Sequence, residues 1–379
     1  MAWRDRALRG AEAPPSRCRG GRTAAPRRLT PVGEQEASPG RIRPFRPDDV
    51  PDLVALRRAV FRFSERPTDA ELAPYLEQVF WANPWRDDEL PSLVYEDSRG
   101  RVGGFLGVIP RPMVFRGEPL RAAVATQLMV APEYRGLVGL RLVRAFRSGL
   151  QDVSLSDAAN DAARRLWQSV GGVVAVAHSV EWERPLRPRW VSALPRPLAA
   201  AVGKTLPNPS EWARLDGCST GPLDAATMTA AAPQLLRDYT LRPRYEDGTF
   251  GWLLGQLAQK RQFGGLEGAL VRMGHTVAGW FLYCLDGNGH GEVVQVVSRA
   301  ADRSLVLAHL FDHARRRGAR SLAGRLAPEF LPALAALRCR LRPGAPWVLV
   351  DAARPEVLLA IAHGAAFFSR LDAEWWLSF

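Results

Sequence analysis

Apolar and polar positions follow one another along this chain in a pattern that predicts strands and helices, most clearly between residues 122 and 146. The apolar run Val124–Val130 predicts a buried strand. A turn with one proline and two glycines follows it. Apolar residues then recur at helical spacing, at Leu140, Leu142, Val143 and Phe146. The spacing therefore predicts a strand, a glycine-bearing turn and a helix in direct succession.

The same pattern predicts the elements on either side of this stretch. Before it, we expect strands at 41–46, 92–95, 102–108 and 113–115, and a helix from Pro47 to Val60. After it, we expect a strand at 153–155, a helix at 157–170, a strand at 172–180 and a polar, proline-stiffened exit at 181–188. The strands from residue 92 to Val130 are thus predicted to form an antiparallel meander.

The second half of the chain repeats the first in outline. Sliding the sequence by 168 residues sets Gln127–Val130 against Gln295–Ser298 and Arg135–Gly139 against Arg303–Leu307. Both glycines of the turn are replaced in the second copy, by a serine and a leucine. Side chains at these positions obstruct the close approach of a ligand, so we expect a degenerate copy. The second series of elements is predicted at 269–273, 277–285, 305–317, 321–324 and 328–337.

Length and composition suit two domains, because the chain has 379 residues of which 47% are hydrophobic. We predict a disordered, Arg-rich tail at 1–40, a first domain at 41–190, a Pro-rich linker at 191–211 and a second domain at 212–379. The end of the chain, Ala373–Phe379, is an apolar segment predicted as a strand. Exposing it would be costly, so we expect it to be buried and the two domains to share an interface.

The net charge of +12 does not indicate a specific nucleic-acid partner, because part of it belongs to the tail and the rest is spread over a long chain. The four cysteines, Cys18, Cys218, Cys284 and Cys339, form no CxxC or Cys/His cluster, so we expect neither a metal nor a disulfide framework. No apolar run of about twenty residues suggests a membrane span, and the tail does not resemble a secretory signal. We expect a cytoplasmic, bacterial protein whose oligomeric state the sequence leaves open.

The glycine-bearing turn is typical of a pyrophosphate site. A turn from a strand into a helix directs unpaired backbone N–H groups and the positive end of the helix dipole to one point. A P-loop would need Lys and then Ser or Thr after its last glycine, but Leu140 and Arg141 follow Gly139. A dinucleotide fold would need glycines at the first, third and sixth positions and a later acidic residue, a pattern that is also not met.

The segments Arg135–Gly139 and Asp157–Val173 together resemble the Gcn5-related N-acetyltransferases (GNAT superfamily). In that family's second signature an Asn opens a helix, and small residues, Leu-Tyr and a helix-ending Gly follow it. Here Asn160, Ala163, Leu166 and Gly171 keep the spacing. The resemblance covers about residues 41–185 and departs from the family at Val138 and Leu140, where glycine or alanine is usual, and at Trp167, where Tyr is usual.

The resemblance implies an α/β fold of two tandem GNAT domains, each a mixed, mostly antiparallel sheet flanked by helices. It also implies an N-acetyltransferase that moves an acetyl group from acetyl-CoA, as co-substrate, to the amine of an unidentified small-molecule or sugar acceptor. The residues that it places around the coenzyme are Leu128, Met129, Val130, Arg135, Gly136, Leu137, Val138, Gly139, Leu140, Asn160 and Trp167. Residues 62–90, with Trp81, Trp85, Asp87, Asp88 and Glu89, are candidates for the acceptor wall.

Acetyl transfer needs a neutral, oriented amine and a base that removes its proton. Gln127 is a candidate for positioning the acceptor or, alternatively, a strand residue bonded in the interior. Asp157 is a candidate base or the cap of the predicted helix. His178 is a candidate base or a core residue of an apolar strand. Trp167 cannot supply the proton that a Tyr supplies in the family.

Two other functions stay open at this point. Tandem GNAT-like domains also occur in aminoacyl transferases that take their acyl group from charged tRNA, although the turn and Asn160 argue against that function here. A non-catalytic binding protein with the same fold is favoured by the departures at Val138, Leu140 and Trp167.

Overall fold

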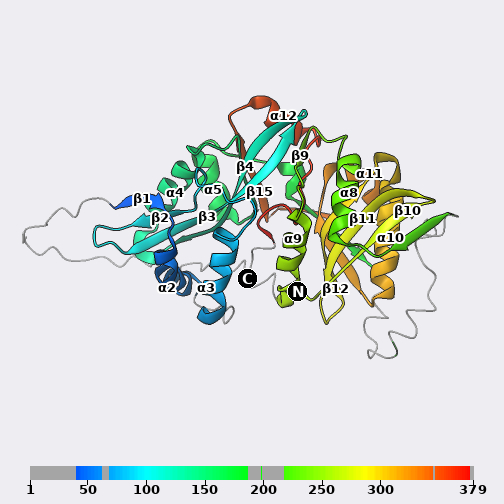
Figure 1. Cartoon of the computed structure of the whole chain (residues 1–379), viewed down its shortest axis with the longest axis horizontal. Helices are drawn as coiled ribbons and strands as arrows, with labels where there is room; N and C mark the ends of the chain where they lie inside the picture. Colours follow the sequence, from blue (N-terminus) through cyan, green and yellow to red (C-terminus); the bar gives the residue numbers. More distant parts are fainter. Residues whose placement is uncertain (1–39, 62–67, 187–197, 199–216, 345, 376–379) are drawn as a thin grey trace, which may run out of the picture. The chain divides into compact units, whose positions relative to one another are not determined.

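The computed structural model of the chain describes residues 40–61, 68–186, 198, 217–344 and 346–375 (Figure 1). The predicted tail (apart from Gly40) and the predicted linker (apart from Leu198) lie outside these residues, so both stay predictions. Within the described part, the strands form one sheet of eight and one of seven, and helices pack against them. The predicted class, with two mostly antiparallel sheets flanked by helices, is confirmed.

The first sheet has the order β1-β2-β3-β4-β5-β15-β6, and β9 pairs with β3. Its neighbours are antiparallel except β4 and β5, which are parallel. The strands are β1 (Arg41–Pro44), β2 (Leu93–Glu96), β3 (Val102–Phe115), β4 (Glu118–Val130), β5 (Val153–Ala159), β6 (Val173–Val174), β9 (Leu241–Pro243) and β15 (Trp347–Ala352). β3 and β4 form one long hairpin, and the shorter strands predicted in this region are parts of it.

The second sheet has the order β14-β7-β13-β12-β11-β10-β8, and its parallel pair is β12 with β13. The strands are β7 (Val180–Pro185), β8 (Cys218–Gly221), β10 (Gly265–Met273), β11 (Thr276–Leu285), β12 (His290–Ser298), β13 (Ser321–Arg325) and β14 (Arg340–Pro343). The predicted repeat has its counterpart in these elements. β4 ends at Val130 and β12 ends 168 residues later, at Ser298. β5 begins at Val153 and β13 begins 168 residues later, at Ser321. The same offset separates Asp157 from Arg325.

The two sheets exchange a strand each. β7 follows β6 in the sequence but lies in the second sheet, between β13 and β14. β15 follows β14 but lies in the first sheet, between β5 and β6. The predicted polar exit at 181–188 is therefore wrong for residues 181–185, which all pair with β13, and residues 181–183 also pair with β14. The predicted domain limits follow the chain, whereas the strands of the two sheets cross them, and the described residues from Gly40 onward belong to one compact unit.

The apolar side chains form three layers. One lies between the first sheet and the helices α4 (Leu137–Arg147) and α5 (Asp161–Ser169), and another lies between the second sheet and α10 (Arg303–Arg316) and α11 (Leu331–Ala336). The third, the shared core, contains residues of both sheets and of the helices α2 (Val50–Val60), α3 (Asp69–Phe80), α8 (Ala225–Leu235), α9 (Thr249–Ala258) and α12 (Pro355–Ala362). The two halves therefore pack against each other through apolar side chains.

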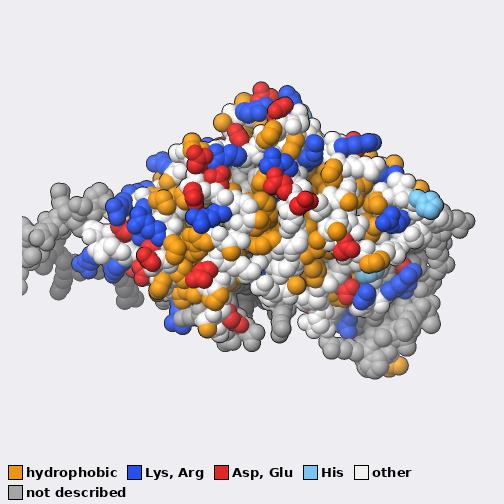
Figure 2. All heavy atoms as spheres, viewed as in Figure 1, with side chains coloured by type: hydrophobic (Ala, Val, Ile, Leu, Met, Phe, Trp, Pro, Cys, Tyr) orange, Lys and Arg blue, Asp and Glu red, His pale blue; other side chains and the backbone are white. Residues whose placement is uncertain are grey.

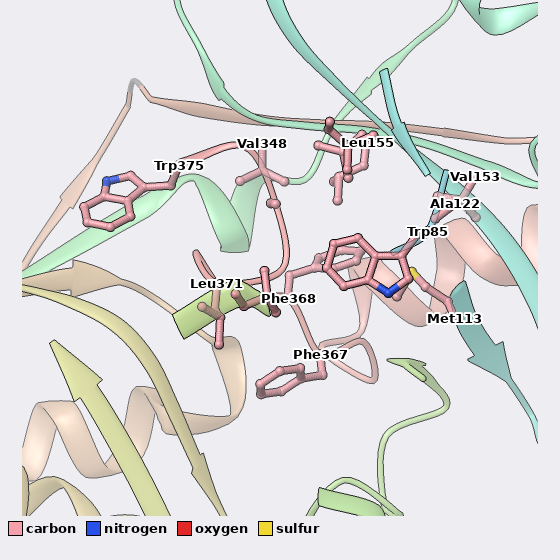
Figure 3. Close-up of a cluster of buried hydrophobic side chains, with 14 of the residues drawn as sticks. Trp85, Met113, Ala122, Val153, Leu155, Val348, Phe367, Phe368, Leu371 and Trp375 are labelled. Carbon is pink, nitrogen blue, oxygen red and sulfur yellow. The ribbon is translucent and has the colours of Figure 1, made fainter. Parts of the chain in front are cut away.

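The last described residues, 366–375, run through the shared core, and we call them the C-terminal segment. All of them are buried. Phe367, Phe368 and Leu371 lie in the cluster with Leu155 and Val348 of the first sheet (Figure 3). The predicted burial of the chain end is confirmed for residues 373–375, but the predicted strand is wrong there, because the segment is irregular.

Candidate active site

The parallel strands β4 and β5 separate at the centre of the first sheet. Their pairs run from Ala122–Val153 to Val124–Leu155 and end there. β4 then continues to Val130 and β5 to Ala159, so the facing edges of both strands lose their strand partner. We call the region between residues 125–130 of β4 and 156–159 of β5 the β4–β5 opening.

A β-bulge lies in β4 within this opening. The register against β3 shifts between Phe105 and Gly107, and Gln127 has a φ of 50°. The bulge reverses the two faces of the strand. Val124 and Met129 both reach the shared core, although their positions differ by five and would lie on opposite faces of a regular strand. Bulges and left-handed non-glycine residues occur often beside functional sites, where they aim a side chain or end a ladder.

The turn after β4 leaves the start of α4 without a cap. The 3-10 turn η2 (Pro132–Tyr134) leads to Gly136, whose φ of 105° and ψ of −86° favour glycine. No side chain of the described residues caps α4, and its first turn contains no acidic residue. A Cβ built on Gly136 meets no described atom within 4 Å. The first N–H groups of α4 and the positive end of its dipole therefore face open space, as an anion site requires.

Glycines in β3 accommodate one of the departures from the family turn. Val138 is buried, and a Cβ on Gly104 would lie 2.9 Å from its Cγ1. A Cβ on Gly103 would likewise lie 2.4 Å from the ring of Tyr134. Val138 thus packs inward against β3 and does not cover the outer side of the turn.

The other residues of the turn divide between packing and exposure. Gly139 is buried, and a Cβ there would lie 3.4 Å from Leu166 of α5, an ordinary van der Waals contact. Leu140 is half-buried, whereas Arg135 and Leu137 are exposed. The exposed fraction of Leu137 is 74%, which is unusual for a leucine and leaves it at the edge of the anion site.

Comparison with known proteins identifies this architecture. Residues 41–157, from β1 into β5, match the family model described as an acetyltransferase (GNAT) domain. This part of the chain is a GNAT domain. The sequence matches none of the curated proteins with which it was compared.

Solved structures show the same fold over most of the chain. A probable N-acyltransferase from Enterococcus faecalis V583 superposes with a TM-score of 0.56 at 12% identity, covering 83% of this chain and 72% of that chain. GCN5-related N-acetyltransferases from Anabaena variabilis (TM-score 0.55, 12% identity, 83% and 73% covered) and Kribbella flavida (0.52, 13%, 83% and 71%) are also similar. At these identities the likeness concerns the fold alone.

The segment predicted to be the second signature lies at the end of β5 and in α5, and after Asp157 it lies beyond the residues that match the family model. Asn160 caps this helix, since its Oδ1 accepts a hydrogen bond of 2.9 Å from the N–H of Ala163. Trp167 is buried and packs against Phe146, with ring centroids 5.9 Å apart. Both residues thus have structural roles, and their predicted places beside a coenzyme stay predictions.

Asp157 lies in β5, not at the start of a helix, so its predicted position and capping role are wrong. α5 begins at Asp161 after the Asn160 cap. The Asp157 side chain is buried, forms an ion pair with Arg325 of β13 and accepts a hydrogen bond of 2.8 Å from the N–H of Glu374. Both oxygens of this carboxylate are therefore occupied, which leaves it less suited to accept a proton from a ligand.

His178 lies in the 3-10 turn η3 (Val176–Ser179), and the strand predicted at 172–180 is wrong except for the two residues of β6 and for Val180, which begins β7. The imidazole is buried against Phe368, and neither ring nitrogen makes a hydrogen bond with a described residue. Burial, and then the charge of Arg325, lower the pKa of His178 to about 4. Arg325 thus adjoins both His178 and Asp157, whereas Gln127 lies on the other strand of the opening.

Glu374 is the ionisable residue of this site that the sequence did not suggest. Its carboxylate accepts hydrogen bonds from Ser156 and from the backbone of β5, 217 residues earlier in the chain. The one available signal was an acidic residue inside the apolar chain end. Nothing in that pattern shows which strand the residue meets.

The predicted acceptor wall divides into packing residues and a polar cavity. Trp85 packs beneath the guanidinium of Arg111, 3.8 Å from its ring centroid, and against Trp252. A cavity of about 140 Å³ is lined by Trp81, Asp87, Asp88 and other residues near the edge of β3. Asp87 also pairs with Arg121 at 2.6 Å, and so does the exposed Glu89 at 3.0 Å. The role of this region in acceptor binding stays a prediction.

The described residues include no helix that is long and apolar enough to cross a membrane. They also include no group of three or more His, Cys, Asp or Glu that could hold a metal ion. Basic and acidic side chains are mixed on the face shown in Figure 2.

Proposed function

We propose that the GNAT domain transfers an acetyl group from acetyl-CoA to the amine of a small-molecule or sugar acceptor. The observation that carries this proposal is the succession of the β4–β5 opening, the bulge at Gln127 and the uncapped start of α4. The edge of β4 beyond the bulge offers backbone N–H groups to a thioester carbonyl, and the start of α4 offers N–H groups to a pyrophosphate. When bound, acetyl-CoA supplies the activated acyl group. The chain has to bind both substrates, orient the acceptor amine and remove its proton.

The first test is calorimetry with acetyl-CoA, in which we expect micromolar binding by the purified chain. Gly136→Asp should weaken binding at least about thirtyfold, or about 2 kcal/mol, because it places a carboxylate beside the pyrophosphate. Gly117→Asp is a matched control, since Gly117 also has a positive φ and open space around its Cβ but lies in the β3–β4 turn. Equal affinity of the wild-type and Gly136→Asp chains would contradict the site.

A second test separates the proposed enzyme from its alternatives. Release of free CoA is followed with a panel of primary amines that includes amino sugars. Amine-dependent release supports an N-acetyltransferase. Binding of charged tRNA without binding of acetyl-CoA would instead indicate the aminoacyl transferase, and binding of neither would indicate a non-catalytic protein.

We also propose that the second half does not bind the coenzyme, because Ser304 and Leu307 stand where the first half has glycines. The calorimetric stoichiometry should be one acetyl-CoA per chain. A cytoplasmic location is proposed as well, because the described thiols of Cys218, Cys284 and Cys339 are free, as they are in a reducing compartment. Fractionation of cells that express the chain tests the location.

A further inference from the structure

The C-terminal segment places one carboxylate, that of Glu374, against β5 at the start of the β4–β5 opening. Its Oε1 accepts hydrogen bonds from the Ser156 hydroxyl at 2.6 Å and from the N–H groups of Asp157 at 3.0 Å and Ala158 at 2.9 Å. These residues follow Leu155, the last residue of β5 that pairs with β4. Asp157 and Ala158 also lie at the register shift of β5 against β15, between the pairs Leu349–Ser156 and Trp347–Ala159. Their N–H groups therefore bind a carboxylate instead of a strand.

The geometry holds one oxygen of this carboxylate and leaves the other available. All three hydrogen bonds go to Oε1, and no described residue donates one to Oε2. The backbone of Glu374 is fixed too, because its N–H donates to Asp157 Oδ1 at 2.8 Å. A carboxylate fixed through one oxygen keeps the lone pairs of the other for a proton.

The other candidates are less suited to accept a proton. Both carboxylate oxygens of Asp157 are occupied, Oδ2 by Arg325 and Oδ1 by the N–H of Glu374. His178 is buried and makes no hydrogen bond with a described residue through either ring nitrogen. Gln127 has an amide, which does not take up a proton at neutral pH.

We propose that Glu374 is the proton acceptor of the acyl transfer in the GNAT domain. The inference rests on the proposed function. Oε2 takes a proton from the ammonium of the acceptor, and the neutral amine attacks the thioester carbonyl. The C–N bond forms as the C–S bond breaks, a second proton from the nitrogen neutralises the leaving thiolate, and Glu374 returns its proton to water.

The charges around Glu374 favour this role. Burial and then the carboxylate of Asp157 raise the pKa of Glu374 to about 7, while the bond from Ser156 opposes the shift. The other charged groups of this region, Arg325 of β13 and Arg370 of the C-terminal segment, interact with Asp157. A base works best when its pKa lies near the pH of the reaction.

The assignment gives the second half of the chain a part in catalysis. The acyl donor would bind to the first half, whereas the base reaches it from residues that follow the whole second half. Correct placement of the base then depends on the shared core, through which the C-terminal segment runs.

The test compares wild type and Glu374→Gln with two acceptor probes at saturating acetyl-CoA. Benzylamine is protonated at neutral pH and needs a base, whereas methoxyamine is already neutral. A glutamine oxygen can still accept from β5, so the fold and the affinity for acetyl-CoA should be kept within about threefold. We expect kcat with benzylamine to fall at least about a hundredfold and kcat with methoxyamine to fall less than tenfold. The rise of kcat/KM with pH near neutrality should also disappear.

Two further variants separate this role from a structural one. Glu329→Gln changes another buried carboxyl with a raised pKa, which bonds to Tyr239 in the second half, and should leave the pH profile unchanged. Ser156→Ala removes a donor to Oε1 and should move the rise of the profile to higher pH, and it serves as the test if Glu374→Gln does not fold.

Each outcome of these experiments either supports or contradicts the role of Glu374. Turnover and a pH profile that Glu374→Gln leaves intact overturn the role of Glu374 while the proposed function stands. A wild-type chain that does not bind acetyl-CoA overturns the proposed function and this inference with it. A wild-type chain that binds acetyl-CoA but acetylates neither probe also contradicts the inference.

Discussion

The β4–β5 opening has a counterpart in the second sheet, and the two differ in what fills them. β12 and β13 also separate after a few parallel pairs, the last being Val293–Gly324, and β12 also has a register shift. In the second opening, however, Phe367, Phe368 and Arg370 of the C-terminal segment lie beside β12 and leave a cavity of about 40 Å³, room for little more than one water. The same backbone frame occurs twice, and in the second copy side chains of the C-terminal segment lie in it.

The paired glutamines show the difference residue by residue. Gln127 lies at the bulge of β4 with a positive φ. Gln295 lies 168 residues later, the offset that also separates Asp157 from Arg325. It is buried and hydrogen-bonds to Trp280 at 2.9 Å and to Ser369 at 3.1 Å. In the first half this position shapes an opening, and in the second half it anchors the chain segment that closes one.

The largest expected effect comes from breaking the strand exchange. Expressed separately, residues 40–198 and 199–379 should each fail to give soluble, folded protein, because each sheet lacks the strand that the other half inserts. Expressed together, they should form one complex. Soluble yield and circular dichroism measure both outcomes, and a fragment 40–198 that melts cooperatively alone would contradict the exchange.

The next largest effect concerns the ion pair that joins the two halves. Asp157 and Arg325 occupy equivalent positions of the repeat and are both buried, with side chains 2% and 6% exposed. Arg325→Met should lower the free energy of unfolding by about 3–5 kcal/mol, since it leaves a buried carboxylate without its partner. Arg86→Met, which breaks an exposed pair with Asp88, is the control and should lower it by less than about 1 kcal/mol in urea titrations.

A pH effect should distinguish the two halves. His178 belongs to the first half, and the residue 168 positions later, in the second half, is Pro346. Because the pKa of His178 is lowered to about 4 in the folded chain from 6.5, the residue stabilises the fold above pH 6.5. This contribution should be lost as the pH falls from 6.5 to 4, by at most about 3 kcal/mol. His178→Phe should flatten the dependence of unfolding free energy on pH in this range, whereas the exposed His363→Phe should not.

The smallest effect sharpens the comparison of the two glutamines. Gln127→Val should be about 1–2 kcal/mol less stable than Gln127→Gly, because glycine tolerates the left-handed backbone and valine does not. Gln295→Gly should instead have no such advantage over Gln295→Val, because the backbone at Gln295 is not left-handed and both variants remove buried hydrogen bonds. Thermal melts that rank the glycine and valine variants alike at both positions would show that the two positions do not differ.

The sequence predicted the local elements well where the apolar period was regular. Val124–Val130, the glycine turn and the helix after it needed only neighbouring residues, and the second signature needed only a known spacing. The period misled at residues 172–188, where an apolar run became β6 and η3 and a polar run became β7. A strand inserted into the other sheet is defined by its partners, and single-sequence periodicity carries no information about them.

The site was predictable only where its residues are close in sequence. The turn at Gly136 was found because strand, turn and helix are contiguous. Asp157 was assigned to a helix because an acidic residue before small residues is typical of a cap, yet its partner Arg325 lies in another strand. Glu374 was missed because its three donors lie in β5, and only the path of the C-terminal segment through the shared core brings them together.

The strand exchange also has a consequence for synthesis on the ribosome. β5 leaves the ribosome long before β15, which begins at Trp347, so the first sheet waits for roughly 200 residues, or about 10–40 s at bacterial elongation rates. During this time β5 and β6 present unpaired edges, which invite pairing with a neighbouring nascent chain. We therefore expect newly made chains to depend on chaperones, and slower translation between β6 and β15 to lower the soluble yield.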